Sequence, residues 1–507
     1  MRSPGPAAPS VASLARRLRA AAEALGVDVA EPAGDPSIDA AQVLPALVAD
    51  VHHDVRAEAV WLLHVALTGS FPGTDAMADA LRAFELQAPD ALELWLTRTW
   101  RAEAQSHRSG LDDVRIVTDA VVFDVSNTAK LDLHTGIQRV IRSAAPHWSA
   151  CGPSVPVAWT DGWQAYRTLS AAERHRVFAW DDHQAGREAA EVVGAQADAP
   201  ALVVPWRSTV LLAESLEAGS CDALAALAIH SGNDLVAIGY DLIPATSGDL
   251  VPAALSDQFM NYLSVVKHTH RVAGISASAA AEFEGFAAML ASQGLTGPTV
   301  GVCELPAPPM PAEAPPIPAG RARVLVVGSY EPRKNHLAVL FAAEQLWQEG
   351  LDFELHLVGG SSWVPAIGRE VDRLADLGRP VERHLAVSEA ELAHQYSSAR
   401  FTVLLSLHEG YGLPVVESLA AGTPALVSDF GSIREIAADG GCRSVDPRDD
   451  AAILSAMRSL LTDDAELAAL QQEIVARPTS TWADYARSSW RLLVGTEPAP
   501  APTGSTA

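Results

Sequence analysis

From residue 114 onward the chain alternates short, apolar, β-rich runs with segments of helical spacing. Examples are "VVFDVS" followed by "TGIQRVIRSAAPHW", and "DLVAIGYDLIP" followed by "LSDQFMNYLSVVKH". The alternation resumes after residue 320 with "RVLVVGS", "HLAVLFAAEQLWQEG", "FELHLVGG" and "FTVLLSL". This order of β-rich runs and helices is typical of parallel βαβ units. The sequence therefore predicts an α/β protein with two doubly wound domains that face each other across a cleft.

Two proline-rich stretches help to place the domain boundaries. The segment "LPAPPMPAEAPPIPAG" at 305–320 predicts a stiff linker, and the ending "TEPAPAPTGSTA" predicts a disordered tail. The expected order is a helical N-terminal extension (1–111), an N-terminal Rossmann-like acceptor domain (112–304), the linker (305–320), a C-terminal Rossmann-like donor domain (321–478), a C-terminal helix packing back across the domains (479–493) and the tail (494–507).

The residues before Asp112 show apolar spacing of three and four, as in "DVRAEAVWLLHVAL" and "DAMADALRAFEL". We expect these helices to form an appended module outside the cleft, so a chain beginning near Gly110 should still fold and bind its ligand. The first helix, "SVASLARRLRAAAEAL", has a basic face that would suit a membrane surface. An ordinary solvated helix face is the preferred interpretation.

The charge and composition exclude some classes of protein. The formal net charge is −26 and the pI is about 4.9, which disfavours nucleic acid as a partner because a polyphosphate backbone would be repelled. The four cysteines are far apart and lack zinc-type spacing, which indicates buried thiols in a reducing compartment. With no signal core and no run of 18 apolar residues, we expect a cytoplasmic protein with no transmembrane segment, possibly at the inner face of the membrane.

The stretch "SLHEGYGLPVVESLAAGTPALVSD" at 406–429 carries two glutamates on either side of a glycine-rich turn. The turn follows the buried strand "FTVLLSL" and precedes a helix with Pro414 near its start. Ligands of open parallel sheets lie at the carboxyl ends of strands, where helix N-termini offer free N–H groups to anions. Glu409 and Glu417 can each accept hydrogen bonds from hydroxyl groups. The pattern predicts a ligand with hydroxyls at both ends and phosphate between them, which is the form of a nucleotide sugar.

A second constellation follows the first strand of the same domain. In "VGSYEPRKNH" at 327–336, Arg333 and Lys334 come just before a helix, where their charges could meet a diphosphate. A solvated basic turn is the alternative for this segment taken alone. Its position next to the Glu409 loop in a doubly wound domain favours the phosphate clamp.

The segments "PRKN", "LVGG", "HEGYGLPVVESLAAGTPALVSD" and "TWADYA" together resemble the C-terminal domain of retaining GT-B glycosyltransferases of family 4 (group 1), with the E-x7-E motif. The resemblance extends over about 170 residues. In the N-terminal half, "DVSNTAKLDLHTGIQRVIR" and "GYDLIP" resemble a bacterial branch of that family associated with mannosyl or rhamnosyl transfer in surface polysaccharides. The first 110 residues carry no such resemblance.

The resemblance implies a role for each matching residue. Glu417 would bind the nucleotide ribose, Glu409 the donor sugar, and Arg333 and Lys334 the leaving diphosphate. The other donor-binding positions that it implies are Gly136, Gly359, Gly410, Tyr411, Gly412 and Leu413. It also implies a retaining hexosyl transfer from a nucleotide-sugar co-substrate to a glycan or lipid-linked acceptor, with GDP-mannose as the best guess for the donor.

The chain departs from the family pattern at two places. Leu405 stands before Ser406 where many members have proline, and we expect this change to be harmless because the strand end is kept. At the strand end "STVLLAES", where many members place a histidine beside the reacting carbon, the chain has Glu214. His134 and Asp241 are weak candidates for contacts near the acceptor; a structural histidine or strand-end carboxylate is the alternative for each.

No D-x-D motif occurs in the sequence, so we expect transfer without a bound metal and without a further cofactor. Two other classes of function stay open. One is a non-catalytic nucleotide-sugar-binding protein of the same fold, which the Glu214 departure permits. The other is a nicotinamide-dependent oxidoreductase, which is disfavoured because neither first strand is followed by G-x-G-x-x-G.

Overall fold

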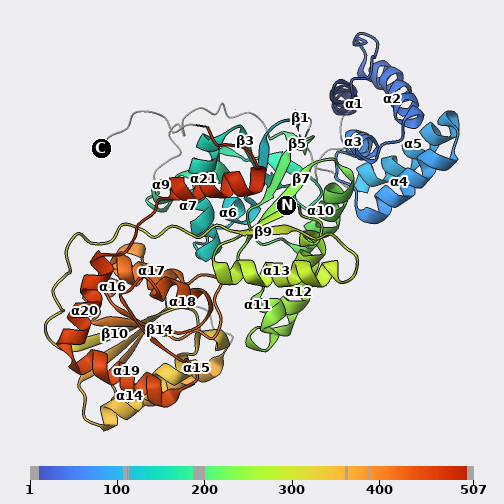
Figure 1. The fold of residues 1–507 in the computed structure, drawn as a ribbon. Helices are drawn as coiled ribbons and strands as arrows, with labels where there is room; N and C mark the ends of the chain where they lie inside the picture. Colours follow the sequence, from blue (N-terminus) through green and yellow to red (C-terminus); the bar gives the residue numbers. More distant parts are fainter. Residues whose placement is uncertain are drawn as a thin grey trace, which may run out of the picture.

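The computed structural model describes residues 11–106, 111, 113–186, 200–359, 364–385 and 387–499. Part of the expected tail, residues 500–507, lies outside these ranges. Within them the fold is α/β, with two sheets whose strands alternate with helices along the chain (Figure 1). The predicted fold class is confirmed. In the described ranges, no helix is both long and apolar enough to cross a membrane.

The chain begins with five helices that lie at one end of the molecule (Figure 1). They are α1 (Val11–Leu25), α2 (Pro36–His53), α3 (Ala57–Thr68), α4 (Thr74–Leu86) and α5 (Pro89–Ser106). Asp35 caps α2 by accepting a hydrogen bond from the Ser37 N–H, and α3 ends at Gly69 in the left-handed conformation. Local capping signals thus set the ends of these helices.

These five helices do not form a separate module. Their apolar faces share one hydrophobic core with strands from across the first sheet. Phe71, between α3 and α4, has its ring centroid 5.8 Å from that of Trp159 and 5.4 Å from that of Tyr166, and its N–H donates to the Gln164 carbonyl. All three aromatic side chains are at most 5% exposed. The expectation that a chain beginning near Gly110 would fold is therefore not supported, because removal of the five helices would expose this core to solvent.

The first sheet has nine strands in the order β1-β5-β4-β3-β2-β6-β7-β8-β9. Its strands are β1 (Val114–Val117), β2 (Val121–Asp124), β3 (Ser154–Trp159), β4 (Tyr166–Thr168), β5 (Leu202–Pro205), β6 (Thr209–Leu212), β7 (Asp234–Gly239), β8 (Arg271–Gly274) and β9 (Thr299–Val302). Its helices are α6 (Ser126–Lys130), α7 (Gly136–Cys151), α8 (Ala171–Phe178), α9 (Trp180–Gln184), α10 (Ala218–His230), α11 (Ile243–Thr246), α12 (Ala253–Val266) and α13 (Ala277–Ala291), with a 3₁₀ turn η1 (Gly248–Leu250).

One strand of this sheet departs from the predicted parallel pattern. β4 pairs antiparallel with both β3 and β5. Only the short turn between Trp159 and Tyr166 joins β3 to β4, and Gly162 and Trp163 adopt positive φ there. A connection this short can return the chain only as a hairpin, because a parallel neighbour needs a crossover of a dozen residues or more.

The second sheet has six parallel strands in the order β12-β11-β10-β13-β14-β15. Its strands are β10 (Ala322–Val327), β11 (Phe353–Val358), β12 (Val381–His384), β13 (Phe401–Leu404), β14 (Ala425–Ser428) and β15 (Cys442–Val445). Its helices are α14 (His336–Gln348), α15 (Pro365–Asp376), α16 (Glu389–Ser398), α17 (Leu413–Ala420), α18 (Gly431–Ala437), α19 (Asp450–Thr462) and α20 (Asp464–Val475), with a 3₁₀ turn η2 (Pro332–Lys334). The strand order reverses between β10 and β13, which is where such sheets bind ligands.

The last helix, α21 (Trp482–Val494), returns to the first domain and lies beside α7 (Figure 1). Trp148 of α7 donates its indole N–H to Ser489 at 2.9 Å, and Arg271 of β8 donates to the Leu493 carbonyl at 2.7 Å. The chain thus crosses between the domains twice, once through residues 305–320 and once before α21. No helix or strand occurs in the first of these crossings.

Candidate active site

A cavity of about 660 Å³ lies between the two domains, at the carboxyl ends of several strands. The N-terminal domain contributes the start of α7 and the loops after β7 and β8; the C-terminal domain contributes the loops after β10 and β13 and the start of α17. The sequence-predicted residues that line the cavity are His134, Gly136, Asp241, Arg333, Lys334, Glu409, Gly410, Tyr411, Gly412, Leu413 and Glu417. We call this cavity the cleft.

Glu409 is held by two cations of its own domain. Arg333 donates to Glu409 Oε2 at 2.7 Å and Lys334 donates to Oε1, which also accepts from the Ser406 hydroxyl at 2.7 Å. The side chains of Lys334 and Glu409 are each 9% exposed. Burial alone would raise the pKa of Glu409, but the charges of Lys334 and Arg333 lower it to about 2. The carboxylate is therefore ionised at any physiological pH.

Glu417 contacts both domains. Its Oε2 accepts a hydrogen bond from the Tyr396 hydroxyl of α16 at 2.8 Å, and its Oε1 forms an ion pair with Arg139 of α7. The ion pair lacks hydrogen-bond alignment, so Oε1 accepts no hydrogen bond from the described residues. Oε1 is therefore free to accept one from a ligand hydroxyl.

Two helices begin in the cleft, one from each domain. α7 starts at Gly136, and α17 starts at Leu413 after Gly412, whose φ is +126°. A Cβ on Gly136 would stand 3.3 Å from Leu413 Cδ1, so the two N-termini are close neighbours. The positive ends of the two helix dipoles make this region suited to an anion.

Gly410 allows the closest approach between the domains. A Cβ there would stand only 2.3 Å from the Tyr240 carbonyl oxygen, and the Gly410 carbonyl accepts from Ser276 at 2.8 Å. A larger residue at this position would push the loop that carries Glu409 away from the N-terminal domain. The glycine is thus required by contact between domains, in addition to any contact with a ligand.

Asp241 follows β7, and its Oδ1 accepts a hydrogen bond from the Ile243 N–H at 3.1 Å. Burial raises the pKa of this carboxyl to about 6. His134 stacks on Trp180 and lies 2.7 Å from Arg142, and burial together with the charges of Arg139 and Arg142 lowers its pKa to about 4. Asp241 therefore changes charge near neutral pH, whereas His134 stays neutral.

The structure places the other two predicted residues outside the cleft. Glu214 accepts hydrogen bonds from the N–H groups of Asn127 and Thr128 at the start of α6, and burial raises its pKa to about 7. Gly359 lies at the end of β11, where a Cβ would be 2.1 Å from the Gly328 carbonyl oxygen. Gly359 thus allows close packing behind the Gly328 turn, and the implied contact with a donor is not supported by its position.

A smaller cavity of about 220 Å³ shares residues with the cleft. Asp241, Tyr240 and Ile137 line both cavities. Its other lining residues come mainly from the loop after β6 and from α12: Glu214, Ser215, Leu216, Pro244, Leu255, Gln258, Phe259 and Tyr262. Glu214 and Asp241, two sequence-predicted carboxyl groups, therefore meet at this second cavity.

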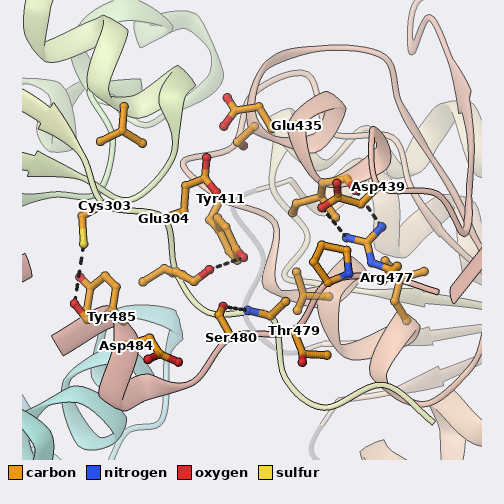
Figure 2. Close-up of a pocket in the computed structure, with 18 of the residues that line it drawn as sticks. Cys303, Glu304, Tyr411, Glu435, Asp439, Arg477, Thr479, Ser480, Asp484 and Tyr485 are labelled. Carbon is orange, nitrogen blue, oxygen red and sulfur yellow. Dashed lines mark hydrogen bonds and ion pairs between the residues drawn. The ribbon is translucent and has the colours of Figure 1, made fainter. Parts of the chain in front are cut away.

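A third cavity, of about 600 Å³, lies between residues 302–310, the C-terminal domain and the start of α21 (Figure 2). Tyr411 and Leu305 line both this cavity and the cleft. The Tyr411 hydroxyl, labelled in Figure 2, donates to the Leu305 carbonyl at 2.9 Å. This bond links the glycine-rich turn to the crossing between the domains.

Sequence reasoning missed several residues of the cleft. Arg139 is the clearest case: it is three residues after Gly136 and thus one helical turn along the same face, a spacing that could have identified it. The pairing of His408 with Glu282 across the domains, at 2.5 Å, had no such signal because α13 and the loop after β13 are far apart in the sequence.

The family comparison concerns the second domain. Residues 312–475 match the family described as "Glycosyl transferases group 1". The matched segment contains Arg333, Lys334, Glu409 and Glu417, so the C-terminal wall of the cleft lies within the part of the chain that is similar to this family.

The chain is also similar to named mannosyltransferases. It is 26% identical over 343 residues to "Serotype-specific mannosyltransferase WbdA" of Escherichia coli, covering 63% of this chain and 39% of that protein. It is 33% identical over 150 residues to "O-antigen chain mannosyltransferase B" of Escherichia coli, covering 29% of this chain and 39% of that protein. The chain thus spans about two fifths of the length of the curated relatives it matches.

A solved structure shows the fold. "Sucrose-phosphate synthase (tll1590) from Thermosynechococcus elongatus" superposes with a TM-score of 0.52 at 16% identity, covering 74% of this chain and 98% of that chain. The fold is therefore GT-B: two doubly wound domains with a cleft between them. The match of residues 312–475 to the group 1 family and the similarity to named mannosyltransferases support a glycosyltransferase.

Proposed function

We propose that the chain is a retaining glycosyltransferase that moves mannose from GDP-mannose to a glycan or lipid-linked acceptor in polysaccharide synthesis. One observation carries the proposal: Glu409, Arg333, Lys334 and Glu417 come together at the starts of two facing helices. The similarity to mannosyltransferases supports the choice of sugar. One of these relatives, from Xanthomonas campestris, is named "GDP-mannose:cellobiosyl-diphosphopolyprenol alpha-mannosyltransferase" and is 32% identical over 117 residues.

The donor would lie along the C-terminal wall. Glu417 Oε1 would accept from a ribose hydroxyl, and Glu409 would accept from hydroxyls of the sugar. Arg333 and Lys334 would then exchange part of their contact with Glu409 for contact with the diphosphate. In the structure the buried cations and carboxylates neutralise one another, which avoids isolated buried charges before a ligand arrives.

Departure of the nucleoside diphosphate places the developing charge on oxygens between the sugar and the nucleoside. Fixed positive groups around that position stabilise the transition state more than the ground state. Arg333, Lys334 and the starts of α7 and α17 are positive groups of the cleft that can do so, beside Arg139, which pairs with Glu417. The protein would thus supply the neutralisation that a metal supplies elsewhere, and we propose transfer without a divalent metal.

The acceptor would enter from the second cavity, which opens beside the cleft at Asp241. Its walls include Leu255, Phe259 and Tyr262, so a ring face or a lipid-proximal sugar could pack there, with Asp241 reaching its hydroxyl. At a pKa of about 6 the ionised Asp241 can accept a proton or orient the hydroxyl near neutral pH. Attack from the side on which the diphosphate leaves would retain the anomeric configuration.

Location follows as part of the same proposal. A cytoplasmic enzyme would meet GDP-mannose directly, and a lipid-linked acceptor would bring it to the inner face of the membrane. The first helix does not offer a free basic face for such contact, because Arg17 is buried and donates to the Ala66 carbonyl, and Arg19 pairs with Asp39.

The test is a panel of labelled nucleotide sugars offered to the full chain, with glycan and lipid-linked acceptors, and with Glu409→Gln as the matched variant. We expect transfer from GDP-mannose, with an α-linked product by NMR, and a large loss in the variant. Nucleotide binding without transfer or hydrolysis for every donor would instead support a non-catalytic binding protein. Binding of a nicotinamide cofactor in place of nucleotide sugars would support the oxidoreductase alternative.

A further inference from the structure

The edge of the second sheet carries a group of side chains that the cleft does not use. β11 and β12 pair in parallel, with His356 opposite Glu382. His384 is two residues beyond Glu382, so both project from the same face of β12. We call His356, Glu382 and His384 the edge cluster.

The distances within the edge cluster match those of metal ligands. His356 Nδ1 lies 3.1 Å from His384 Nε2, and Glu382 Oε2 lies 3.6 Å from His384 Nε2 and 3.9 Å from His356 Nδ1. A point about 2.1 Å from all three atoms exists inside this triangle, and zinc bonds to imidazole nitrogen and to carboxylate oxygen have about that length. A single ion can therefore reach all three atoms without movement of the backbone.

A further carboxylate orients the buried histidine. Glu354 Oε2 is 3.3 Å from His356 Nε2, so the Nε2–H can donate to it while Nδ1 faces the edge cluster. Arg321 and Arg323 each lie 3.8 Å from a carboxylate oxygen of Glu354. A metal-bound histidine usually donates its other ring N–H to a carboxylate in this way, which fixes its orientation.

The three side chains of the edge cluster differ in how far they are exposed to solvent. The side chain of His356 is 5% exposed, that of His384 is 26% exposed and that of Glu382 is 60% exposed. The inner ligand is therefore fixed by packing, and the outer two can adjust to an ion. The open side leaves room for water as a fourth ligand.

We propose that the edge cluster is a zinc site, formed by His356 Nδ1, His384 Nε2 and a carboxylate oxygen of Glu382. Two imidazoles and one carboxylate suit zinc and other late transition metals, whereas Mg²⁺ and Ca²⁺ prefer sets of oxygen ligands. The ion would join the edge strand β12 to β11. The site is separate from the cleft, because none of its residues lines that cavity.

The experiment uses the full chain without a histidine tag, stripped with chelator and dialysed. Zn²⁺ alone is titrated by calorimetry, the melting temperature is recorded with and without Zn²⁺, and Co²⁺ is added as a spectroscopic probe. We expect one equivalent of Zn²⁺ to bind at micromolar or lower concentration and to raise the melting temperature, with Co²⁺ giving the absorption of a low-coordinate nitrogen and oxygen site. Mg²⁺ should change neither quantity.

Two variants and one control distinguish a built site from adventitious binding. His384→Gln, at a partly exposed position, should abolish the Zn²⁺-dependent change in melting temperature, and Glu354→Gln should weaken binding about 10- to 100-fold. His394→Gln, an exposed histidine on the neighbouring helix α16, should bind as the unchanged chain does. Equal Zn²⁺ binding by His384→Gln and the unchanged chain, or binding only at millimolar concentration, would overturn the proposal.

Discussion

The two walls of the cleft are built in different ways. The C-terminal wall concentrates its charged groups in two short segments, at Arg333–Lys334 and Glu409–Glu417, and its main ion pairs are internal to that domain. The N-terminal wall offers the start of α7, the backbone at Tyr240 and the single carboxyl of Asp241, drawn from separate segments of the domain. The main ion pairs of the C-terminal wall thus lie within one domain, whereas the N-terminal wall is assembled from segments that are far apart in the sequence.

This difference indicates that the two walls suit different ligands. Pre-formed charge of the kind around Glu409 suits the donor diphosphate, which is common to many transferases of this fold. The N-terminal wall combines apolar side chains with His134, Arg139 and the carboxyl of Asp241, and this mixture suits an acceptor, whose chemistry varies more. Charged pairs such as Arg139–Glu417 and His408–Glu282 join the two domains.

The largest expected effect concerns the first five helices. Deletion of residues 1–110 should give insoluble or unfolded protein, because Phe71, Trp61 and their neighbours would leave a core that also contains Trp159 and Tyr166. Each large buried side chain contributes about 1.5–3 kcal/mol, against a total stability of about 5–15 kcal/mol for a typical protein. Solubility, circular dichroism and nucleotide binding of the truncated chain are the measurements. A soluble, cooperatively folding product would show that the N-terminal wall stands without these helices.

Lys334→Ala tests the charged wall. The change removes a fixed cation from the proposed leaving group and should lower turnover on the order of 100-fold or more. Turnover with the labelled donor is the measurement, and a melting curve shows that the chain is folded. Lys267→Ala, which removes a lysine at the end of α12 away from the cleft, is the control and should keep full activity. A loss of less than about threefold in Lys334→Ala would mean that the phosphate clamp has been misassigned.

The two glutamates should respond differently because only one of them contacts the other wall. Glu409→Gln should lower turnover more than affinity. Glu417→Gln should mainly weaken donor binding, by about 1–3 kcal/mol for a charge-assisted hydrogen bond. Steady-state kinetics together with calorimetry of nucleotide binding separate the two effects. Small, equal changes in both quantities for both variants would contradict the assignment of ribose to Glu417 and sugar to Glu409.

The stabilisation that the ion pair between His408 and Glu282 gives to the folded chain should depend on pH. The hydrogen bond to Glu282 and the nearby charges of Glu282, Asp241 and Glu409 outweigh burial and raise the pKa of His408. The stabilisation is therefore fully present below the ordinary histidine pKa and is lost as the pH rises through the raised value. His408→Gln should cost about 1.5 kcal/mol at pH 6 and progressively less towards pH 9.

Thermal unfolding of the unchanged chain, His408→Gln and the control His394→Gln across this pH range measures the effect. The loss of stability in His408→Gln should shrink as the pH rises. A loss that grows with pH would contradict a raised pKa of His408, and His408 would then not be a charged link between the domains.

The smallest expected effect is that of a chelator on turnover. Because Arg333, Lys334 and the helix N-termini supply the positive charge, transfer from the donor should continue in excess chelator. Assays well below the melting temperature keep this result independent of the proposed zinc site, whose loss would change stability. Complete loss of activity, restored by manganese or magnesium, would instead indicate that carboxylates such as Glu409 are metal ligands.

Sequence reasoning reached most of the C-terminal wall because its residues are contiguous. The turn at Gly410–Gly412, between a strand and a helix, places Glu409 and Glu417 on either side of one helix N-terminus, and both line the cleft. Gly359, which only the family resemblance implied, packs closely against Gly328, and Gly328 lines the cleft. A glycine motif alone does not distinguish close packing from contact with a ligand.

The sequence by itself determined the α/β class, the division at the proline-rich segment and the charged segments of the second domain, since each depends on local spacing and on strand ends that meet at one edge. Only the tertiary structure decided that the first five helices share a core with the sheet, that Arg139 reaches Glu417 and that His356 meets His384. Those contacts join residues that are distant in the chain. Their geometry depends on how helices and strands pack, which periodicity and motif spacing do not encode.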